Sequence, residues 1–415
     1  MSSEQSVPDI RFDGFNGEWT EKLLFEVAEK ISVGIATSSS KHFVSLSNGV
    51  PFIKNQDIKN GVIDTKNLEA ISNEFDKANK NKRLKTGDIL TVRTGYPGLS
   101  AVLPSSLNNA QSFTTLITRI NCKEVNPFFV STYINSDSGK IQMNGMQAGG
   151  AQKNINANTL KNFAIYYPNL LEEQTKVANY FKSLDNLINQ HQEKHEKLCN
   201  LKKAMLEKMF PKAGETVPEI RFEGFSGDWE EKELGRDIAE IVGGGTPSTS
   251  VSDFWDGDID WYSPTEIGKR VYAEGSQKKI TRLGLKSSSA KILPAGKTVL
   301  FTSRAGIGDM AILTKSGTTN QGFQSFVCKD GYSPYFLYSA GHLIKGYALK
   351  HASGSTFLEI SGKQLAQMIL LVPSSDEQNQ IGDYFKKLDE LINQHSQQIT
   401  KLKNIKQACL DKMFV

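Results

Sequence analysis

The chain has 415 residues, of which 38% are hydrophobic and 23% charged, and its net charge is +4. This composition is that of a globular protein, and the length is too great for one ordinary hydrophobic core, so we expect two domains with connecting segments. The mild positive charge permits a polyanionic partner but does not require one.

The cysteines and the N-terminus indicate the compartment. Cys122, Cys199, Cys328 and Cys409 show no CxxC spacing, which is typical of reduced thiols and not of a disulfide frame or a zinc site. Residues 1–5 are polar and do not form a signal peptide, and no apolar run approaches the ~20 residues of a membrane helix. We therefore expect a cytoplasmic protein without membrane contact.

The sequence repeats itself at both ends of each half. Residues 7–19 return at 217–229, displaced by 210 positions, and residues 180–191 return at 384–395, displaced by 204. The segments between these repeats diverge. One active site would not need two copies of a frame, whereas a protein that reads two targets would. The pattern therefore predicts two related domains that share a frame and differ in their inserts.

The first insert has short strands joined by glycine-rich turns, with polar features at three places. A basic stretch at 77–85 suits phosphate contact, although a solvated loop explains it equally well. Arg93 follows an apolar strand and could bind guanine or a phosphate, or could instead pin a loop through carbonyl groups. A polar loop before Ile155 carries groups suited to base edges. The residues predicted to bind DNA in this half are Lys82, Arg83, Arg93, Gln152 and Lys153.

Three motifs resemble catalytic or phosphate-binding sites only in part. Residues 126–129, Asn-Pro-Phe-Phe, resemble the Asn-Pro-Pro-Tyr/Phe loop of amino-methyltransferases. They lack its second proline and their duplicate begins with Ser333, so the start of a helix explains them better. Residues 296–298 lack the leading glycine of a phosphate loop, and Pro247 removes a donor from the glycine-rich loop at 243–248. We predict no catalytic residue and no metal site in this chain.

Each half closes with a helix whose apolar residues follow a heptad. In residues 169–212 and 374–415, steps of four and three residues meet mainly apolar side chains over about four heptads, the seam of a coiled coil. Two equal seams in one chain most simply pair with each other, as spacers of roughly 50–55 Å. The residues predicted to form the seam and to bind partners are Phe181, Leu184, Ile188, Leu198, Phe385, Leu388, Ile392 and Leu402.

Two histidines of the first seam have the spacing of a helical zinc site. His191 and His195 are four residues apart, but the segment lacks the glutamate of that motif. Ile399 replaces His195 in the duplicate. We therefore interpret both histidines as seam residues.

The second insert carries the same landmarks with different residues. With two residues of slack, the strand before Arg304 aligns with the strand before Arg93, and residues 320–323 align with 110–113. A second basic stretch, beginning at Lys269, precedes that strand. Three aromatic residues, Trp255, Trp261 and Tyr262, are expected in the core. The residues predicted to bind DNA in this half are Thr246, Ser248, Lys269, Arg270, Arg304, Lys350, Ser355 and Thr356.

These elements predict an α+β fold with an internal pseudo-two-fold repeat. Two β-rich α+β domains, at 1–168 and 213–373, would be separated by two long helices that pair as an antiparallel coiled coil. The helices would occupy 169–212 and 374–415.

The closing helices carry a shared pattern, Glu-Gln-xx-Ile/Val-xx-Tyr-Phe-xx-Leu-Asp-xx-Ile. It runs from Glu173 to Ile188 and from Glu377 to Ile392. Together with the repeated heads, this pattern resembles that of the specificity subunit of type I restriction–modification systems. The resemblance covers nearly the whole chain.

The loop at 243–248, which leads to Trp-Asp-Gly-Asp-Ile at 255–259, also resembles that family. The first half has a different, serine-rich stretch at 34–40. Because the variable domains of the family differ widely, this departure bears on the target sequence and not on the class of protein.

The resemblance implies a subunit without catalysis or cofactor of its own. Each variable domain would read one half of a split, asymmetric target in double-stranded DNA, and the helices would set the gap and dock two modification subunits. Those partners would carry S-adenosylmethionine and methylate adenine. Restriction subunits would hydrolyse ATP with Mg and cut the DNA.

Two other functions remain open on the residues alone. One is a self-contained DNA methyltransferase, against which the missing cofactor and Asn-Pro-Pro-Tyr motifs argue. The other is a scaffold of two sugar- or peptide-binding domains on a coiled coil, which a failure to bind duplex DNA with partner subunits present would favour.

Overall fold

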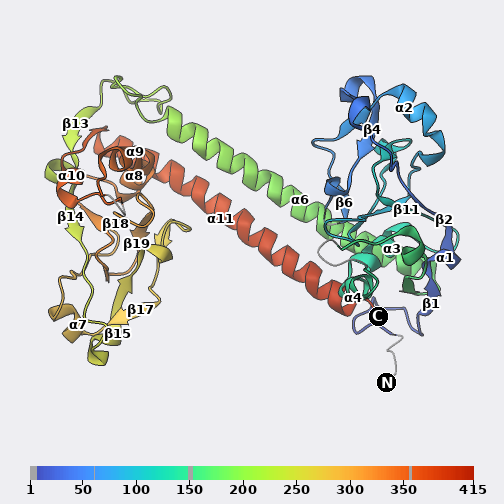
Figure 1. The fold of residues 1–415 in the computed structure, drawn as a ribbon. Helices are drawn as coiled ribbons and strands as arrows, with labels where there is room; N and C mark the ends of the chain where they lie inside the picture. Colours follow the sequence, from blue (N-terminus) through green and yellow to red (C-terminus); the bar gives the residue numbers. More distant parts are fainter. Residues whose placement is uncertain (1–6, 60, 148–152, 355–357) are drawn as a thin grey trace. The chain divides into compact units, whose positions relative to one another are not determined.

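The computed structural model describes residues 7–59, 61–147, 153–354 and 358–415. The chain divides into two compact units: unit 1 comprises Met1–His191 and Gln398–Val415, and unit 2 comprises Gln192–Gln397. Two 38-residue helices, α6 (Leu171–Lys208) and α11 (Ser375–Lys412), contribute to both units and are green and red in Figure 1.

Unit 1 is built on two four-stranded sheets. Its strands are Thr20–Leu23 (β1), Ala28–Val33 (β2), Phe43–Val44 (β3), Val50–Ile53 (β4), Ile58–Lys59 (β5), Val62–Ile63 (β6), Glu69–Ile71 (β7), Ile89–Thr91 (β8), Ser100–Val102 (β9), Gln111–Ser112 (β10), Leu116–Ile120 (β11) and Ala164–Tyr167 (β12). One sheet is antiparallel, in the order β2-β11-β8-β9. The other has the order β10-β4-β7-β3, with β10 parallel to β4. The remaining pairs are β1 with β12 and β5 with β6.

The helices of this unit include the one that the sequence predicts to start at residues 126–129. They are Leu24–Val27 (α1), Asn73–Ala78 (α2), Pro127–Asn135 (α3), Asp137–Gly145 (α4) and Ala157–Lys161 (α5), followed by α6. The Asn126 side chain caps α3 by accepting hydrogen bonds from the backbone N–H groups of Phe128 and Phe129, and Pro127 lies in the first turn. The residues that resemble a methyltransferase loop are therefore an ordinary helix start.

Unit 2 has a five-stranded sheet, a three-stranded sheet and one further pair. Its strands are Glu230–Glu233 (β13), Ala239–Gly243 (β14), Trp255–Tyr262 (β15), Tyr272–Ala273 (β16), Lys278–Ile280 (β17), Thr298–Phe301 (β18), Met310–Leu313 (β19), Gly317–Thr319 (β20), Gln324–Cys328 (β21) and Ile369–Val372 (β22). The sheets have the orders β14-β21-β18-β19-β16 and β17-β15-β20, and β13 pairs with β22. Because β18 follows residues 296–297 directly, no phosphate-binding loop-to-helix turn exists there.

The helices of unit 2 repeat the plan of unit 1. They are Arg282–Lys286 (α7), Pro334–Ser339 (α8), Gly341–His351 (α9) and Gly362–Ala366 (α10), followed by α11. Ser333 caps α8 as Asn126 caps α3. None of the helices in the described parts of the chain is both long and apolar enough to cross a membrane.

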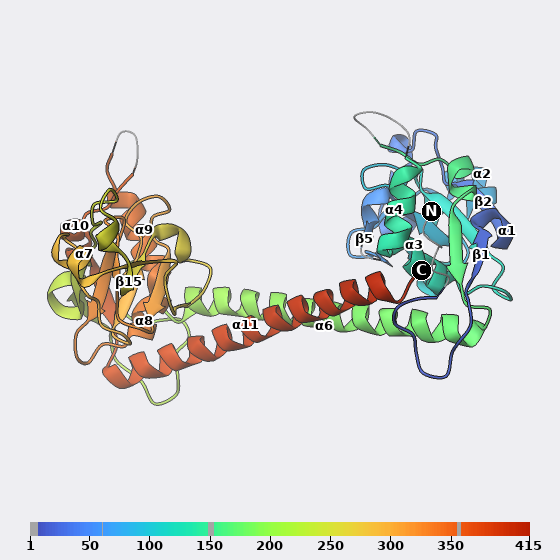
Figure 2. The same ribbon diagram turned by 90° about the horizontal axis from the view of Figure 1, so that it is seen from below.

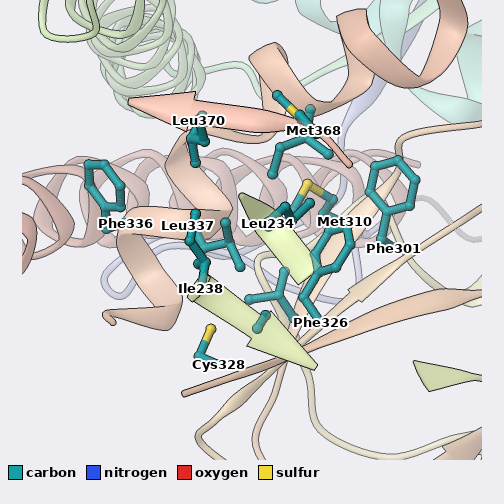
Figure 3. Close-up of a cluster of buried hydrophobic side chains, with 14 of the residues drawn as sticks. Leu234, Ile238, Phe301, Met310, Phe326, Cys328, Phe336, Leu337, Met368 and Leu370 are labelled. Carbon is teal, nitrogen blue, oxygen red and sulfur yellow. The ribbon is translucent and has the colours of Figure 1, made fainter. Parts of the chain in front are cut away.

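Each unit has its own hydrophobic core. In unit 2, Leu234, Phe301 and Phe326 are fully buried, and Figure 3 shows them gathered with Met310 and neighbouring side chains. Strands, helices and the turn at Leu234–Ile238 all contribute to this cluster. Two of the three aromatic residues expected in the core, Trp261 and Tyr262, are buried in smaller clusters of the same unit, and the third, Trp255, is half-buried.

The helices α6 and α11 contact each other within each unit. In unit 1, Asp185 of α6 binds Lys406 of α11 at 2.5 Å, and the Tyr180 hydroxyl contacts Cys409 Sγ at 3.5 Å. The residue numbers rise along one helix as they fall along the other, so the helices are antiparallel. In unit 2, Lys202 of α6 binds Asp389 of α11, also at 2.5 Å. These observations confirm the predicted α+β class with its paired helices.

The two histidines with zinc-site spacing lie in the helix seam. His191 and His195 are half-buried at seam positions of α6. Within the described ranges, no group of three or more His, Cys, Asp or Glu side chains could hold a metal ion.

The repeated sequence forms a repeated set of contacts, which we call the frame. Arg11 in the head of unit 1 makes two hydrogen bonds to the buried Glu173 at the start of α6, at 2.6 and 2.8 Å. Arg221 binds Glu377 of α11 in the same way, at 2.7 Å for both. The glutamate of the shared helix pattern therefore holds the head of each unit to the beginning of its helix.

The last turn of the opposite helix completes each unit. Phe414, just after α11, packs against Phe129 of α3 in unit 1, with ring centroids 5.5 Å apart, and Figure 2 shows the C-terminus beside α3. Phe210, just after α6, packs in unit 2 against Phe336 of α8, also at 5.5 Å. Each core thus needs the end of the other helix.

Candidate nucleic-acid interface

The turn between β8 and β9 is the most elaborate polar feature of unit 1, and we call residues 92–99 reading loop 1. The backbone N–H of Val92 donates to the Leu99 carbonyl at 2.8 Å, and that of Gly98 donates to the Val92 carbonyl at 3.0 Å. Asn55 accepts from the Arg93 N–H and donates to the Thr94 hydroxyl, both at 3.3 Å. These contacts hold the base of the loop in place.

Arg93 has an unused donor at this loop. Its side chain is half-buried, and its Nε is buried with no hydrogen-bond partner among the residues that the structure describes. Its carbonyl accepts from the N–H of Ile155 at 3.1 Å, so the predicted polar loop before Ile155 returns to this point. A buried guanidinium donor without a partner is costly.

Unit 2 has the equivalent turn between β18 and β19, residues 302–309, which we call reading loop 2. The Thr302 N–H donates to the Asp309 carbonyl and the Gly308 N–H to the Thr302 carbonyl, each at 3.0 Å. The Ile360 N–H donates to the Ser303 carbonyl at 3.1 Å. Each of these bonds has a counterpart in reading loop 1.

The hydrogen bonds correct the alignment of the two loops. They place Val92 opposite Thr302 and Gly98 opposite Gly308, so no slack is needed between the loops. Arg93 therefore corresponds to Ser303, and Arg304 corresponds to Thr94. The sequence alignment was wrong because it matched two arginines by residue type, whereas the turn fixes backbone position.

A second alignment is corrected in the same way. Phe113 N–H donates to the carbonyl of Ile53, and Asn320 N–H donates to the carbonyl of Tyr262. Residues 111–113 therefore correspond to 318–320, and not to 321–323. The chain between this point and the reading loops differs in length between the units, which residue matching could not show.

Most of the predicted residues of unit 2 border reading loop 2. Thr246 hydrogen-bonds Gln321, and Gly322 lies against Arg304, where an added Cβ would be 3.4 Å from its Nε. The turn that precedes Lys269 and Arg270 meets Asp309 of the loop at Gly268, and both basic residues are exposed. Ser248 is exposed on the same glycine-rich loop as Thr246.

Three further predicted residues of unit 2 are placed differently. Lys350 is exposed, but it lies in the last turn of α9 and not in a loop as expected. Ser355 and Thr356 fall outside the described residues. The neighbouring segment returns to the loop through the bond between Ile360 and Ser303.

Two residues of the basic stretch of unit 1 make internal contacts. Arg83 makes a forked ion pair with the buried Asp76 of α2, which lowers the pKa of that carboxyl group. Lys82 Nζ donates to the Gly34 carbonyl at 2.9 Å. The expectation of phosphate contact at these two residues is therefore not supported by their partners. Lys153 is exposed near reading loop 1, and Gln152 falls outside the described residues.

The residues predicted to bind partners on the helices are seam residues. Side chains that the seam buries offer little external surface, and their predicted contact with a partner stays a prediction. Those that are buried are Phe181, Leu184, Ile188, Phe385 and Leu388, and those that are half-buried are Leu198, Ile392 and Leu402.

Four other apolar side chains are exposed at equivalent positions in each unit, and we call each set the repeated flank. All eight are between 36% and 47% exposed. They are Val7, Ile10, Leu187 and Ile405 in unit 1, and Val217, Ile220, Leu391 and Leu201 in unit 2.

Heptad geometry places the helix members of a flank on one side of the seam. Leu187 and Ile405 each precede a seam residue by one position, and equivalent heptad positions of two antiparallel helices lie along the same edge. Ile10 donates its N–H to the Lys412 carbonyl at 2.9 Å, which brings the head to that end of α11. In unit 2, Ile220 donates to the Lys208 carbonyl at the same distance.

Sequence reasoning missed three features of these surfaces. Asn55 bonds the base of reading loop 1, Tyr96 lies within that loop, and the exposed members of the flanks were passed over in favour of the seam. The signals were present: Tyr96 stands between glycines just after a predicted strand, and Leu187 and Leu391 repeat as apolar residues outside the seam.

The comparisons with known proteins agree with this architecture. The family model described as "Type I restriction modification DNA specificity domain" matches twice, at residues 16–200 and 226–404. A similar protein is the type I restriction enzyme MjaIX specificity subunit of Methanocaldococcus jannaschii, 35% identical over 45% of this chain and 44% of that protein. Another is the EcoR124I/EcoR124II specificity subunit of Escherichia coli, 30% identical over 40% of this chain and 42% of that protein. These matches thus span less than half of each relative.

A solved structure shares the fold over nearly the full length. It is the crystal structure of a type I restriction–modification system S subunit from M. genitalium, with a TM-score of 0.68 and 15% sequence identity. The alignment covers 99% of both chains. With two matches of the family model covering most of its length, the chain belongs to the family of type I restriction–modification DNA specificity subunits, with two target-recognition domains.

Proposed function

We propose that each unit reads one half of a bipartite, asymmetric target in double-stranded DNA, chiefly through its reading loop. The single observation that carries this proposal is the contrast inside the repeat. The frame contacts recur residue for residue, whereas the loops at one backbone position carry different side chains. Arg93, Thr94 and Tyr96 in one loop correspond to Ser303, Arg304 and Gly306 in the other. Different readers on equal frames suit two different half-sites.

The repeated flanks are proposed to dock two identical modification subunits. Equal surfaces on a pseudo-symmetric chain present equal sites to two copies of one partner. Those partners would bring S-adenosylmethionine and methylate adenine, and restriction subunits would join with ATP and Mg to cut DNA. This chain would contribute recognition and no cofactor.

Stoichiometry tests the flanks. Leu187→Asp places a charge on the flank of unit 1 only, so the purified complex should lose one of its two modification subunits. Adding Leu391→Asp should remove the second. Leu283→Asp is a matched control, because Leu283 is an exposed leucine on α7 outside both flanks. Two bound partners in the double variant would exclude this surface.

The paired helices are proposed to set the spacer between the half-sites. One heptad contributes about 10 Å of helix, equal to about three base pairs. Deleting one heptad from each of α6 and α11 keeps the seam in register. We expect the variant to recognise a target with a shorter spacer, or none. An unchanged spacer would show that the helices do not set it.

Mapping of N6-methyladenine is the direct test of the whole proposal. The chain would be expressed with its modification subunit in a host without adenine methylation, with the modification subunit alone as control. A new split motif with a fixed, unspecified gap supports DNA reading by two units. No new motif from a soluble, assembled complex would contradict it.

A further inference from the structure

Tyr96 in reading loop 1 is the most exposed large hydrophobic side chain in the described part of unit 1. Its exposure is 81%, against 51% for Phe25, another exposed aromatic of the same unit. Tyrosine is enriched at binding surfaces because its ring offers a large apolar contact area and its hydroxyl group a polar tip.

The backbone beneath Tyr96 is a tight turn. The Leu99 N–H points to the Tyr96 carbonyl at 3.4 Å, Pro97 occupies the second position, and Gly98 has a φ of 102° at the third. Proline followed by a residue of positive φ is the pattern of a type II turn. The turn fixes the direction in which the chain presents the ring.

Neighbouring elements clamp this turn from several sides. An added Cβ at Gly98 would lie 2.5 Å from Cγ of the buried Met143 on α4, so the turn sits directly on that helix. Thr94 forms a β-bridge with Asn154, and Asn55 bonds both Arg93 and Thr94. A ring held on a fixed base loses little conformational entropy on binding.

Unit 2 has no such residue at the equivalent place. The loops have equal length, and Gly306, with a φ of 111°, stands where unit 1 has Tyr96. The neighbouring Ile307 is buried, and the Thr302 hydroxyl donates to the Gly306 carbonyl at 2.6 Å. At this position, reading loop 2 therefore makes contacts within itself and presents no aromatic side chain.

This asymmetry indicates which kind of partner covers Tyr96. A modification subunit that docks equally on both units would need a contact that both units provide. Tyr96 has no counterpart, so its partner differs between the units, as two DNA half-sites do. Arg93 lies in the same loop, with its side chain half-buried and its Nε without a hydrogen-bond partner among the described residues.

Resting on the proposed function, we infer that Tyr96 stacks on a base of the half-site read by unit 1. Aromatic rings stack on bases of any identity, and an aromatic wedge at a base step favours flexible steps. The contact is apolar, so it adds affinity that is independent of counterion release. The half-site of unit 2 is read without a stacking ring from reading loop 2.

The test uses the chain assembled with its modification subunits and duplex DNA that carries the methylated motif. The dissociation constant is measured for wild type, Tyr96→Ala, Tyr96→Phe and Phe25→Ala at several salt concentrations. We expect Tyr96→Ala to weaken binding by about tenfold to a hundredfold at every salt concentration, with an unchanged salt slope. Tyr96→Phe should stay within about twofold of wild type, and Phe25→Ala should not differ.

Two outcomes would overturn the inference. Tyr96→Ala is compared with wild type at equal assembly, and equal affinity would show that the ring touches no base. A loss in Tyr96→Phe as large as that in Tyr96→Ala would assign the contact to the hydroxyl group and exclude stacking.

A second measurement separates this inference from the proposed function. 2-Aminopurine placed in either half-site reports base stacking by fluorescence, and the signal that depends on Tyr96 should arise in one half only. Arg304→Ala should impair the other half. If the wild-type complex does not bind the duplex, the proposed function itself fails. If it binds, and no position of either half-site responds to Tyr96→Ala, only the stacking inference fails.

Discussion

The frame and the reading loops of this chain have diverged to very different extents. Arg11 and Arg221 bind their glutamates with hydrogen bonds that agree within about 0.1 Å, while the loops share backbone bonds and almost no side chains. A contact that serves the same purpose in both units is held constant on both. A contact that meets a different half-site in each unit is free to change. The comparison separates scaffold from specificity within one sequence.

The largest expected effect is on the frame. Arg11→Ala leaves Glu173 buried without its cation, and breaking a buried pair costs about 3–5 kcal/mol. Arg221→Ala should cost the same in unit 2 because its pair has the same burial. Denaturant unfolding measures both, with Lys59→Ala, from an exposed pair, as the control. A difference of more than about 1 kcal/mol between the two variants would break the equivalence of the frames.

The reading loops should respond in the opposite way. Arg304→Ala removes a half-buried guanidinium group that has no internal ion pair among the described residues, so the free energy of unfolding should change little. Binding of the assembled complex to its DNA target should weaken by about 1–3 kcal/mol, or roughly five- to a hundredfold. Arg236→Ala is the control, since Arg236 is an exposed arginine whose partners are Asp237 and Glu233. Equal DNA affinity in Arg304→Ala and wild type would remove this residue from the interface.

The repeated heads and helices could be predicted from the sequence because their patterns are periodic or duplicated. The seam follows from the heptad, and Asn126 and Ser333 announce helix starts by their capping chemistry. The reading surfaces could be predicted only in part. Thr246 bonds Gln321, and the next residue, Gly322, lies beside Arg304; no local pattern encodes such contacts between segments far apart in the chain.

Arginine roles were the hardest to predict, because an arginine looks the same whether it faces a ligand or a carboxylate of its own chain. Arg83 lies in a basic stretch, but the buried Asp76 seven residues earlier holds its guanidinium group. Asp76 meets Arg83 only when the chain after α2 folds back onto that helix, so the sequence alone does not show the pair. The loop alignment failed for a related reason, since Arg93 and Arg304 share a residue type and not a backbone position.

Arg83→Ala tests whether Arg83 stabilises the fold through Asp76 and does not contact DNA. Its expected effect is smaller than those of the substitutions above. We expect a loss of about 1–2 kcal/mol in unfolding free energy and no change in the salt slope of DNA binding. The pair lowers the pKa of Asp76, so its stabilisation is present above the ordinary aspartate range and is lost as pH falls through the lowered value. The difference from wild type should therefore be largest near neutral pH and fade in acid. A reduced salt slope at full stability would restore Arg83 to the DNA surface.

The smallest expected effect concerns a helix contact that differs between the two units. Asp389 accepts a hydrogen bond from the Tyr335 hydroxyl at 2.8 Å as well as its ion pair with Lys202. The corresponding ring in unit 1 is Phe128, which has no hydroxyl, so Asp185 has Lys406 as its partner and burial raises its pKa.

Asparagine substitutions at the two aspartates measure that difference. Because burial raises the pKa of Asp185, this carboxyl group is ionised less readily in the folded protein than in the unfolded chain. The free energy of unfolding therefore falls as pH rises through the raised pKa. Asp185→Asn should therefore be within about 0.5 kcal/mol of wild type or slightly more stable near neutral pH, and should lose that advantage in acid. Asp389→Asn should lower the free energy of unfolding by about 1 kcal/mol, because it weakens the contacts of this side chain with both Lys202 and Tyr335. Tyr335→Phe removes the hydroxyl group that unit 1 lacks. In that background, Asp389→Asn should lower the free energy of unfolding by less than it does in wild type. An equal loss in both backgrounds would show that the hydroxyl group does not distinguish the two units.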